Sequence, residues 1–152
     1  MIVEEKLKIS TELPDSKRVL LNVLYTSNFV TDEITSALRP FDITTQQFNV
    51  LRILKGINPK SCSLQCIQDR MISKMSNTTR LVDKLIAKHL VKREQCESNR
   101  RKVDITITEQ GLEALKFIDK AVDTAEQRLA ASLTEKELQL LDSLLNKLRH
   151  KD

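Results

Sequence analysis

The spacing of apolar residues predicts a chain built mainly from α-helices, the first of them long. Pro14 and Asp15 are residues that favour the start of a helix, and the helical pattern continues from there to about residue 39. Its apolar positions form one stripe: Val19, Leu20, Val23, Leu24, Val30, Ile34, Ala37 and Leu38. This stripe is too wide for a helix that packs on one side only. We therefore expect the helix to be buried against both its own core and a partner subunit.

Later helices begin at recognisable capping residues. Thr44 with Gln47, and Thr134 with Glu137, each match the pattern of a capping box. Ser63 is a suitable cap for a short helix that ends near residue 71. Over about residues 109–149, apolar residues recur at spacings of three and four: Leu115, Ile118, Val122, Ala125, Leu129, Leu138, Leu141, Leu145 and Leu148. Such narrow seams suit helix-on-helix packing, including packing between subunits.

An amphipathic helix and a hairpin follow each other in the middle of the chain. One helical face carries Thr78, Leu81, Val82 and Leu85, and the other carries Asn77, Arg80 and Lys84. The helix is expected to end near His89, in a left-handed conformation that His enters more readily than most residues. Val103, Ile105 and Ile107 then alternate as in a half-buried strand, with LVKRE as the partner strand and CESNRR as the loop. This order of elements predicts a winged helix-turn-helix within a mainly α (α+β) fold.

The positive charge of the protein is concentrated in this same region. Residues 68–104 contain ten Lys or Arg and five Asp or Glu, a net charge of +5, whereas the rest of the chain carries −1. A run of charge is often only a solvated surface. A basic patch confined to one helix and its neighbouring hairpin is instead typical of nucleic-acid binding.

The amphipathic helix supplies the residue types that bind double-stranded DNA. The major groove admits a helix, and the start of a recognition helix is where side chains usually meet base edges. We expect Asn77 and Arg80 to read bases, and Ser76 to read a base or hold a phosphate. Lys74 and Lys84 would neutralise phosphates.

The hairpin supplies a second contact. Arg100 and Arg101 lie in its expected loop and would reach an adjacent minor groove, whose negative potential attracts arginine. The hairpin has no aromatic residue, so stacking on a single-stranded ligand is poorly supported.

The chain resembles the MarR family of bacterial transcriptional regulators over nearly its whole length. The matching residues are ITTQQFNVLRIL, TRLVDKL, LVKRE and NRRKVDITITEQG. The resemblance implies one domain, residues 1–152, in which dimerisation helices (about 15–39 and 109–149) flank a winged unit (about 44–107). It further implies a homodimer on a pseudo-palindromic operator, and a repressor that is released by a small lipophilic or phenolic effector or by thiol oxidation.

Two positions depart from the pattern of that family. Asn99 stands where the family usually has an Asp that helps to orient the wing arginines, and His89 stands where it usually has Gly. By resemblance, Arg101 matches the arginine that enters the minor groove, and Arg80 matches an arginine of the recognition helix.

The three cysteines leave several roles open. Three is an odd number, which argues against a disulfide framework in a reducing compartment. Cys62 and Cys66 have no apparent third or fourth metal ligand, so we expect no metal site, and Cys66 is expected to be a small buried hydrophobe. Cys96 lies close to three arginines in the sequence, a setting that favours a reactive thiolate. An alternative function is therefore a thiol-based redox-sensing regulator on the same scaffold, with Cys96 as the sensor.

Aromatic residues indicate where an effector would bind. Tyr25 and Phe29 are one helical turn apart and are expected to meet Phe48. Aromatic residues at this spacing are often plain core, so the two interpretations stay open.

Other classes of protein find little support. There is no phosphate-cradling glycine-rich loop, no metalloprotease motif and no suitably placed histidine, so we expect neither an enzyme nor a cofactor. No apolar run could span a bilayer and no signal peptide is recognisable, which favours the cytoplasm. A winged-helix module that binds another protein instead of DNA is a further alternative.

Overall fold

The other elements of the protein are arranged around two long helices. The computed structural model describes the backbone of residues 3–96 and 99–150 and the side chains of residues 3–95 and 103–150. Helix α2 (Asp15–Leu38) packs against α6 (Glu109–Ala130). Beside the first half of α6 lie α3 (Thr45–Ile57), α4 (Leu64–Arg70) and α5 (Thr78–Ala87), with the antiparallel hairpin of β1 (Val91–Cys96) and β2 (Asn99–Ile107). We call these three helices and the hairpin the winged unit.

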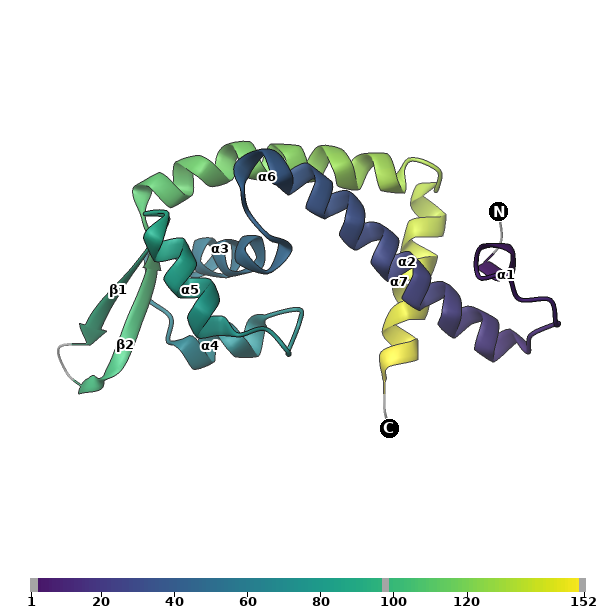
Figure 1. Ribbon diagram of the computed structural model, residues 1–152, viewed down its shortest axis with the longest axis horizontal. Helices are drawn as coiled ribbons and strands as arrows, with labels where there is room; N and C mark the ends of the chain where they lie inside the picture. The colour runs from purple at the N-terminus through teal and green to yellow at the C-terminus, as the bar shows by residue number, and fades with distance from the viewer. Residues whose placement is uncertain (1–2, 97–98, 151–152) are drawn as a thin grey trace.

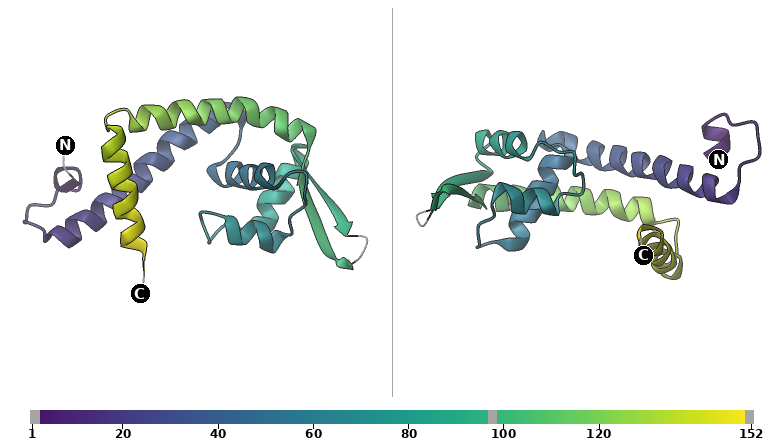
Figure 2. Two further views of the ribbon diagram at one scale, coloured as in Figure 1. Left: turned by 180° about the vertical axis from the view of Figure 1, so that it is seen from behind. Right: turned by 90° about the horizontal axis from the view of Figure 1, so that it is seen from below.

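The winged unit lies at one end of the molecule and both chain termini lie toward the other (Figures 1 and 2). The short helix α1 (Val3–Lys6) precedes α2, and α7 (Glu135–Arg149) follows α6. A single turn of 3-10 helix, η1 (Arg39–Phe41), connects α2 to the winged unit. The described part of the chain is thus a mainly helical winged-helix fold with a two-stranded sheet, as the sequence predicted.

Capping residues mark the helix starts as the sequence predicted. The backbone N–H of Gln47 donates to Thr44 Oγ1 (3.1 Å) while Gln47 Oε1 accepts from the N–H of Thr44 (3.0 Å). Thr134 and Glu137 form the second capping box. The hydrogen bond between the N–H of Thr134 and the Glu137 carboxylate lowers the pKa of that exposed carboxyl, since it stabilises the charged form.

One apolar core joins the winged unit to the long helices. Its fully buried side chains come from every helix of the unit, from β2 and from α6: Val50, Leu51, Leu54, Ile67, Val82, Leu85, Ile105, Leu115, Ile118 and Val122. Leu38, at the end of α2, is also fully buried. The periodic apolar residues of α6 therefore complete the core of the winged unit. Buried apolar contacts hold the winged unit against α6.

The hairpin is longer than the sequence predicted. The stretch from residue 96 to 101 was expected to be a loop, yet the strands include Cys96, Asn99, Arg100 and Arg101, with a register shift between Gln95 and Cys96. The sequence of this stretch, CESNRR, has no alternation of apolar and polar residues, and that alternation is the pattern by which a half-buried strand is recognised.

A disulfide joins Cys62 to Cys66, which overturns the expectation that no disulfide forms. Cys62 is extended and its backbone pairs with Ile105 of β2 (N–O distances of 2.9 and 3.0 Å). Ser63 then caps α4, and this turn brings the Cα atoms of the two cysteines to 5.7 Å. That separation lies within the usual disulfide range. Cys62 is the buried member, and Cys66, expected to be buried, is only partly so.

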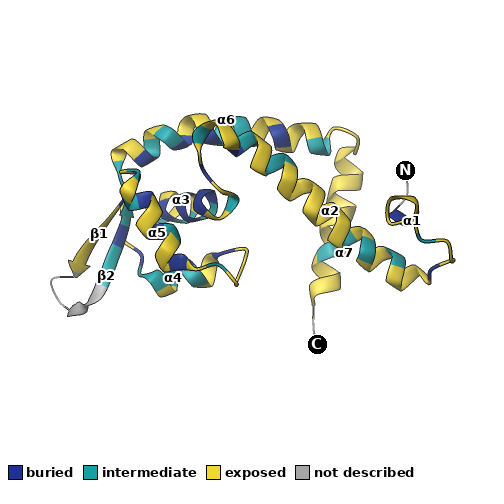
Figure 3. Cartoon of the chain, viewed as in Figure 1, coloured by how far each residue is buried: buried dark blue, intermediate teal, exposed yellow. Residues whose placement is uncertain are grey.

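Two helices keep their apolar stripes exposed. Large apolar side chains of α2 and α7 are exposed to solvent: Val19, Leu20, Leu24, Tyr25, Phe29, Val30, Leu138, Leu140, Leu141, Leu144 and Leu148. No residue of α7 is buried, and Figure 3 shows this helix almost entirely in the colour of exposed residues. None of the described helices is long and apolar enough to cross a membrane.

Gly111 is required where α6 begins, because the backbone of Leu90 passes close to it. A Cβ added at Gly111 would lie 2.2 Å from the carbonyl oxygen of Leu90 and 2.7 Å from Ile107 Cγ1. We expect Gly111→Ala to reduce the free energy of unfolding by about 1–3 kcal/mol, the usual cost of overpacking.

The matched control for this prediction is Gly56→Ala, since a Cβ there would have no neighbour within 4 Å. That variant should be unchanged, or more stable by up to about 1 kcal/mol because alanine favours the helix. Urea unfolding at one protein concentration compares the two. Equal midpoints for both variants would contradict the steric role of Gly111.

Candidate nucleic-acid interface

Helix α5 is held by one buried face, which leaves its opposite face exposed. Thr78, Val82 and Leu85 are buried, with Val82 and Leu85 at 0 % exposure. Arg80 and Lys84 lie on the other side and are exposed. The amphipathic pattern seen in the sequence therefore directs these two cations away from the core.

Asn77 caps the start of α5. Its side-chain Oδ1 accepts a hydrogen bond from the backbone N–H of Arg80 (3.1 Å). The sequence predicted base reading for this amide, and the cap is a role that was not predicted. The cap uses one of the two lone pairs of Oδ1, so the Nδ2 amide group is the better placed to meet a ligand.

Gln68 of α4 ties the start of α5 to the rest of the unit. Its Oε1 accepts from the hydroxyl of Thr78, and its Nε2 donates to the carbonyl oxygen of Lys74 (2.9 Å). Gln68 was not among the site residues predicted from the sequence. The sequence does signal that a partner is needed, because Thr78 places a hydroxyl on the apolar face of a helix and a buried hydroxyl needs a polar partner.

A groove of about 430 Å³ runs between the start of α3 and α5. Four of the predicted DNA-binding residues line it together, namely Ser76, Asn77, Arg80 and Lys84. Gln46 and Met75 also line it and were not predicted. Lys74 does not line the groove, and its ammonium group donates to the carbonyl oxygen of Asp69.

The connection between α4 and α5 presents apolar side chains to solvent beside this groove. Ile72 is 89 % exposed and Met75 is 95 % exposed, among the most exposed large apolar residues of the described chain. The Ser76 hydroxyl oxygen nearby is buried and has no hydrogen-bond partner within the described residues. These features sit at the end of α5 that the sequence assigned to base contacts.

The hairpin is fastened to α5 by an ion pair. The guanidinium of Arg93 on β1 lies 3.0 Å from the carboxylate of Asp83. The predicted site residues Arg100 and Arg101, and the predicted sensor Cys96, have side chains outside the described residues. Their strand positions nevertheless place all three in the outer part of the hairpin.

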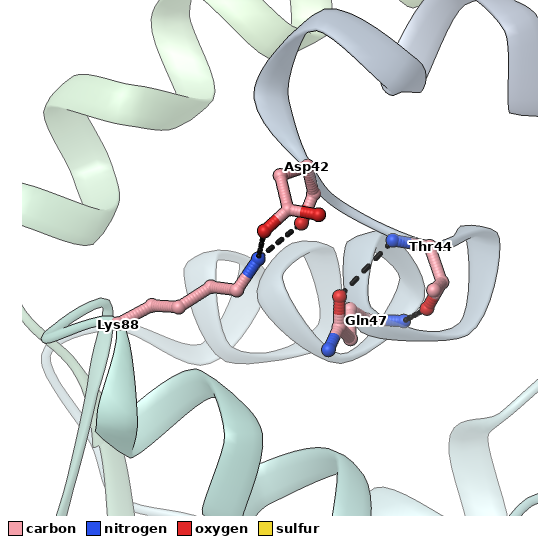
Figure 4. Close-up of polar contacts among 4 residues, drawn as sticks. All are labelled: Asp42, Thr44, Gln47 and Lys88. Carbon is pink, nitrogen blue, oxygen red and sulfur yellow. Dashed lines mark hydrogen bonds and ion pairs between the residues drawn. The ribbon is translucent and has the colours of Figure 1, made fainter.

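A second ion pair fixes the other end of α5. The ammonium group of Lys88 lies 2.6 Å from Asp42 Oδ2 and also donates to the carbonyl oxygen of Asp42, as Figure 4 shows. Asp42 adopts a left-handed conformation with φ of 53°, directly after η1. The hydrogen bond and charge of Lys88 lower the pKa of the Asp42 carboxyl. This contribution to stability is present at neutral pH and is lost as the pH falls through that lowered pKa.

A cavity of about 600 Å³ lies between α2, α3, α6 and the connection that precedes α5. Its apolar wall includes Phe48, Val30, Ile34, Met71 and Val122. Its polar groups include Arg52, Asn49 and Glu126, and the Arg52 guanidinium lies 5.7 Å from the centre of the Phe48 ring.

The three aromatic residues predicted to line one pocket are separated. Phe48 lines this cavity, whereas Tyr25 and Phe29 line a different and smaller one near α1, of about 210 Å³. Consecutive residues of a helix are rotated by about 100°. The stripe of α2 that carries Val30 and Ile34 faces the cavity, and the stripe of Tyr25 and Phe29 therefore points elsewhere.

Comparison with known proteins connects this geometry to one family. Residues 43–103 match the model of the MarR family, which covers α3, α4, α5 and most of the hairpin.

Solved structures show the same fold over most of the chain. A MarR-like transcription regulator from Bacillus cereus superposes with a TM-score of 0.81 at 20 % identity, covering 89 % of this chain and 96 % of that one. A mutant of MarR from Escherichia coli, complexed with operator DNA, gives 0.78 at 22 % identity, with coverages of 92 % and 100 %. Bordetella bronchiseptica BpsR, whose DNA binding is regulated by 6-hydroxynicotinic acid, gives 0.80 at 20 % identity, with coverages of 93 % and 100 %.

Two substitutions at Asn77 separate its cap from its other roles. Asn77→Ala removes the acceptor and should lower the free energy of unfolding by about 1 kcal/mol. Asn77→Asp keeps an acceptor and places a negative charge at the positive end of α5, so stability should be retained. Chemical unfolding of the two variants beside the wild type measures this difference. Equal loss in both would show that the cap does not stabilise α5.

Proposed function

We propose that this chain, whose residues 43–103 match the model of the MarR family, is a sequence-specific regulator of transcription that binds double-stranded DNA in the cytoplasm. The observation that carries the proposal is the exposed face of α5. Arg80 projects from it in the first turn and Lys84 in the last turn, within a region whose net charge is +5. A helix with this distribution of charge suits the major groove.

Within the proposal, the residues of α5 divide into base readers and phosphate binders. Arg80 is the principal base reader, since a guanidinium can bond to both O6 and N7 of guanine. Asn77 contributes chiefly its Nδ2 amide group, because one lone pair of its oxygen caps the helix. Ser76 reads a base or holds a phosphate once its hydroxyl, which is buried and unpaired among the described residues, turns outward. Lys84 binds phosphate directly, and Lys74 does so once it leaves the carbonyl of Asp69.

The wing completes the contact in this proposal. The strand that carries Arg100 and Arg101 continues from Val103 and Ile105, which anchor it to the core. Arginine side chains on such a projecting hairpin suit a narrow minor groove next to the major-groove site.

We further propose that two copies act together as a homodimer. The apolar side chains exposed on α2 and α7 are numerous and continuous along each helix, and no described part of the same chain covers them. Apolar surface of this extent is typical of an interface. Two winged units related by a two-fold axis would read the halves of a pseudo-palindromic operator, about 34–36 Å apart along the DNA.

The cavity beside Phe48 supports regulation by a small molecule. It is bounded both by the long helices and by residues 71–73, which lead directly into α5. A lipophilic or phenolic effector bound there would push on the connection that positions the recognition helix. The proposed outcome is a repressor that is released when the effector binds. The regulation of BpsR by 6-hydroxynicotinic acid is consistent with a small aromatic effector.

Selection of bound duplexes from a random DNA pool tests the proposed function. We expect enrichment of an inverted repeat, and an affinity for it that falls steeply as salt rises, because phosphate contacts release counterions. Weak binding to every duplex with no enriched sequence would contradict a sequence-specific regulator. Binding to another protein without salt dependence would instead indicate an interaction module.

Substitutions on α5 should then act in two different ways. Arg80→Ala is expected to cost about 1–3 kcal/mol of binding free energy and to relax preference at one base position. Lys84→Ala should weaken binding to all sequences similarly and reduce the salt slope by about one unit.

The control for both is Lys116→Ala, which removes a cation on α6 that pairs only locally with Glu113. Its affinity and salt slope should match those of the wild type. If Arg80→Ala and Lys84→Ala also matched the wild type on the selected duplex, the assignment of α5 as the recognition helix would be wrong.

A further inference from the structure

Met75, in the connection between α4 and α5, is the most exposed large apolar side chain of the described residues, at 95 %. Single exposed apolar residues are common on protein surfaces, so exposure alone indicates no function. Its neighbours distinguish Met75, because it lines the groove between α3 and α5 together with Asn77, Arg80 and Lys84. An apolar side chain thus lies in a groove whose proposed contacts with DNA are otherwise polar or positively charged.

The backbone on both sides of Met75 is held in place. The carbonyl oxygen of Lys74 accepts a hydrogen bond from Gln68 Nε2 (2.9 Å). The N–H of Ser76 donates to the carbonyl oxygen of Ser73 (3.4 Å), which closes a turn around Met75. The side chain itself lies outside the core formed by the described residues. The position of Met75 before α5 is therefore fixed, while its side chain is left available to a partner.

The major groove of DNA offers such a side chain one apolar partner. Base edges there present hydrogen-bond donors and acceptors, and thymine alone among the four bases adds a methyl group, at C5. The thioether of methionine is a weak acceptor and no donor, so it reads donors and acceptors poorly. Its flexible and polarisable chain packs well on apolar groups of varied shape. Contact with a thymine methyl group would bury apolar surface on both partners.

We propose that Met75 reads the C5 methyl group of a thymine in the major groove and sets a preference for thymine in each half of the operator. The inference rests on the proposed DNA-binding function and adds a specificity-determining residue to it. Because Met75 and Arg80 line the same groove, this thymine lies close to the base that Arg80 reads.

A protein surface is the other class of partner that would cover an exposed methionine. The surroundings of Met75 favour DNA, because Arg80 and Lys84 line the same groove and complement a polyanion. Ile72 provides a matched control on the same connection. It is similarly exposed, at 89 %, but it lines the cavity beside Phe48 and not the groove.

Replacement of thymine by uracil in the selected duplex tests the inference, because uracil pairs in the same way and lacks only the C5 methyl group. Each thymine of the two half-sites is replaced in turn, and the affinity of the full-length protein is measured for every duplex. We expect a thymine in each half-site at which the replacement weakens binding by the wild type about fourfold, the usual contribution of one buried methyl group.

The variants assign this methyl contact to one side chain. Met75→Ala should weaken binding to the unmodified duplex about fourfold for each half-site. It should also lose the response to uracil at that thymine, so that the two changes do not add. Met75→Leu keeps an apolar side chain and should retain the response. The salt slope of Met75→Ala should equal that of the wild type, since the contact neutralises no phosphate.

Ile72→Ala should respond to uracil as the wild type does. Thermal unfolding of the Met75 and Ile72 variants should stay close to that of the wild type, because both side chains are almost fully exposed.

Three results would overturn the inference. If the wild type were insensitive to uracil at every thymine of the selected duplex, Met75 would have no methyl group to read. If Met75→Ala kept the full sensitivity, another side chain would read the methyl group. If the sensitivity were lost in Ile72→Ala and kept in Met75→Ala, the role would pass to Ile72. Failure of the proposed function looks different, since then no duplex would be enriched and none would be bound specifically.

Discussion

Burial of one face of α5 is the interaction on which the rest of the molecule depends. Val82 and Leu85 are completely excluded from solvent, in the same core as Leu51 of α3, Ile67 of α4 and Ile105 of β2. Removing a buried Leu from such a core costs about 2–5 kcal/mol. Because this face must be inside, the face that carries Arg80 and Lys84 must be outside. The hydrophobic effect therefore sets which residues of α5 face outward and form the proposed DNA interface, although none of the buried residues belongs to that interface.

Polar contacts refine the position of α5 but cannot replace that burial. The carboxylate of Asp42 is almost fully exposed and the pair of Arg93 with Asp83 is partly exposed, so solvent screens both ion pairs and they contribute little to stability. The bond of Gln68 to the buried Thr78 hydroxyl matters more, since a buried polar group left without a partner costs about 1–3 kcal/mol. These contacts lie at both ends of α5. Packing thus fixes which face is buried, and the polar contacts fix where the helix starts and ends.

The sequence predicts those features whose cause is local. The capping boxes at Thr44 and Thr134 each depend on two residues that are three apart in the sequence. The left-handed backbone at His89, with φ of 59°, was predicted because a helix end favours this conformation and no glycine is present there to adopt it. The outer hairpin could not be predicted because residues 96–101 show no alternation of apolar and polar side chains. The disulfide could not be predicted because it depends on the pairing of Cys62 with Ile105, more than forty residues away.

The candidate site shows the same division. Arg80 and Lys84 were predicted from helical periodicity, and they line the groove together. Gln68 could not be predicted because its partners lie in the next helix and in the connection before that helix. Phe48 was predicted to share a pocket with Tyr25 and Phe29 because all three are aromatic. The rotation along α2 instead directs Tyr25 and Phe29 into a different cavity.

Residues 71–73 connect the cavity to α5, which gives a physical reason for placing regulation there. They line the cavity beside Phe48, and the N–H of Ile72 donates to Asn49 Oδ1 of α3 (2.9 Å). The same segment continues into Met75, Ser76 and the cap of α5. Only a ligand that interacts differently with two arrangements of this segment can shift α5. One wall of the cavity is formed by α2 and α6 and another by residues 71–73, so a ligand bound in it would contact both the long helices and this segment.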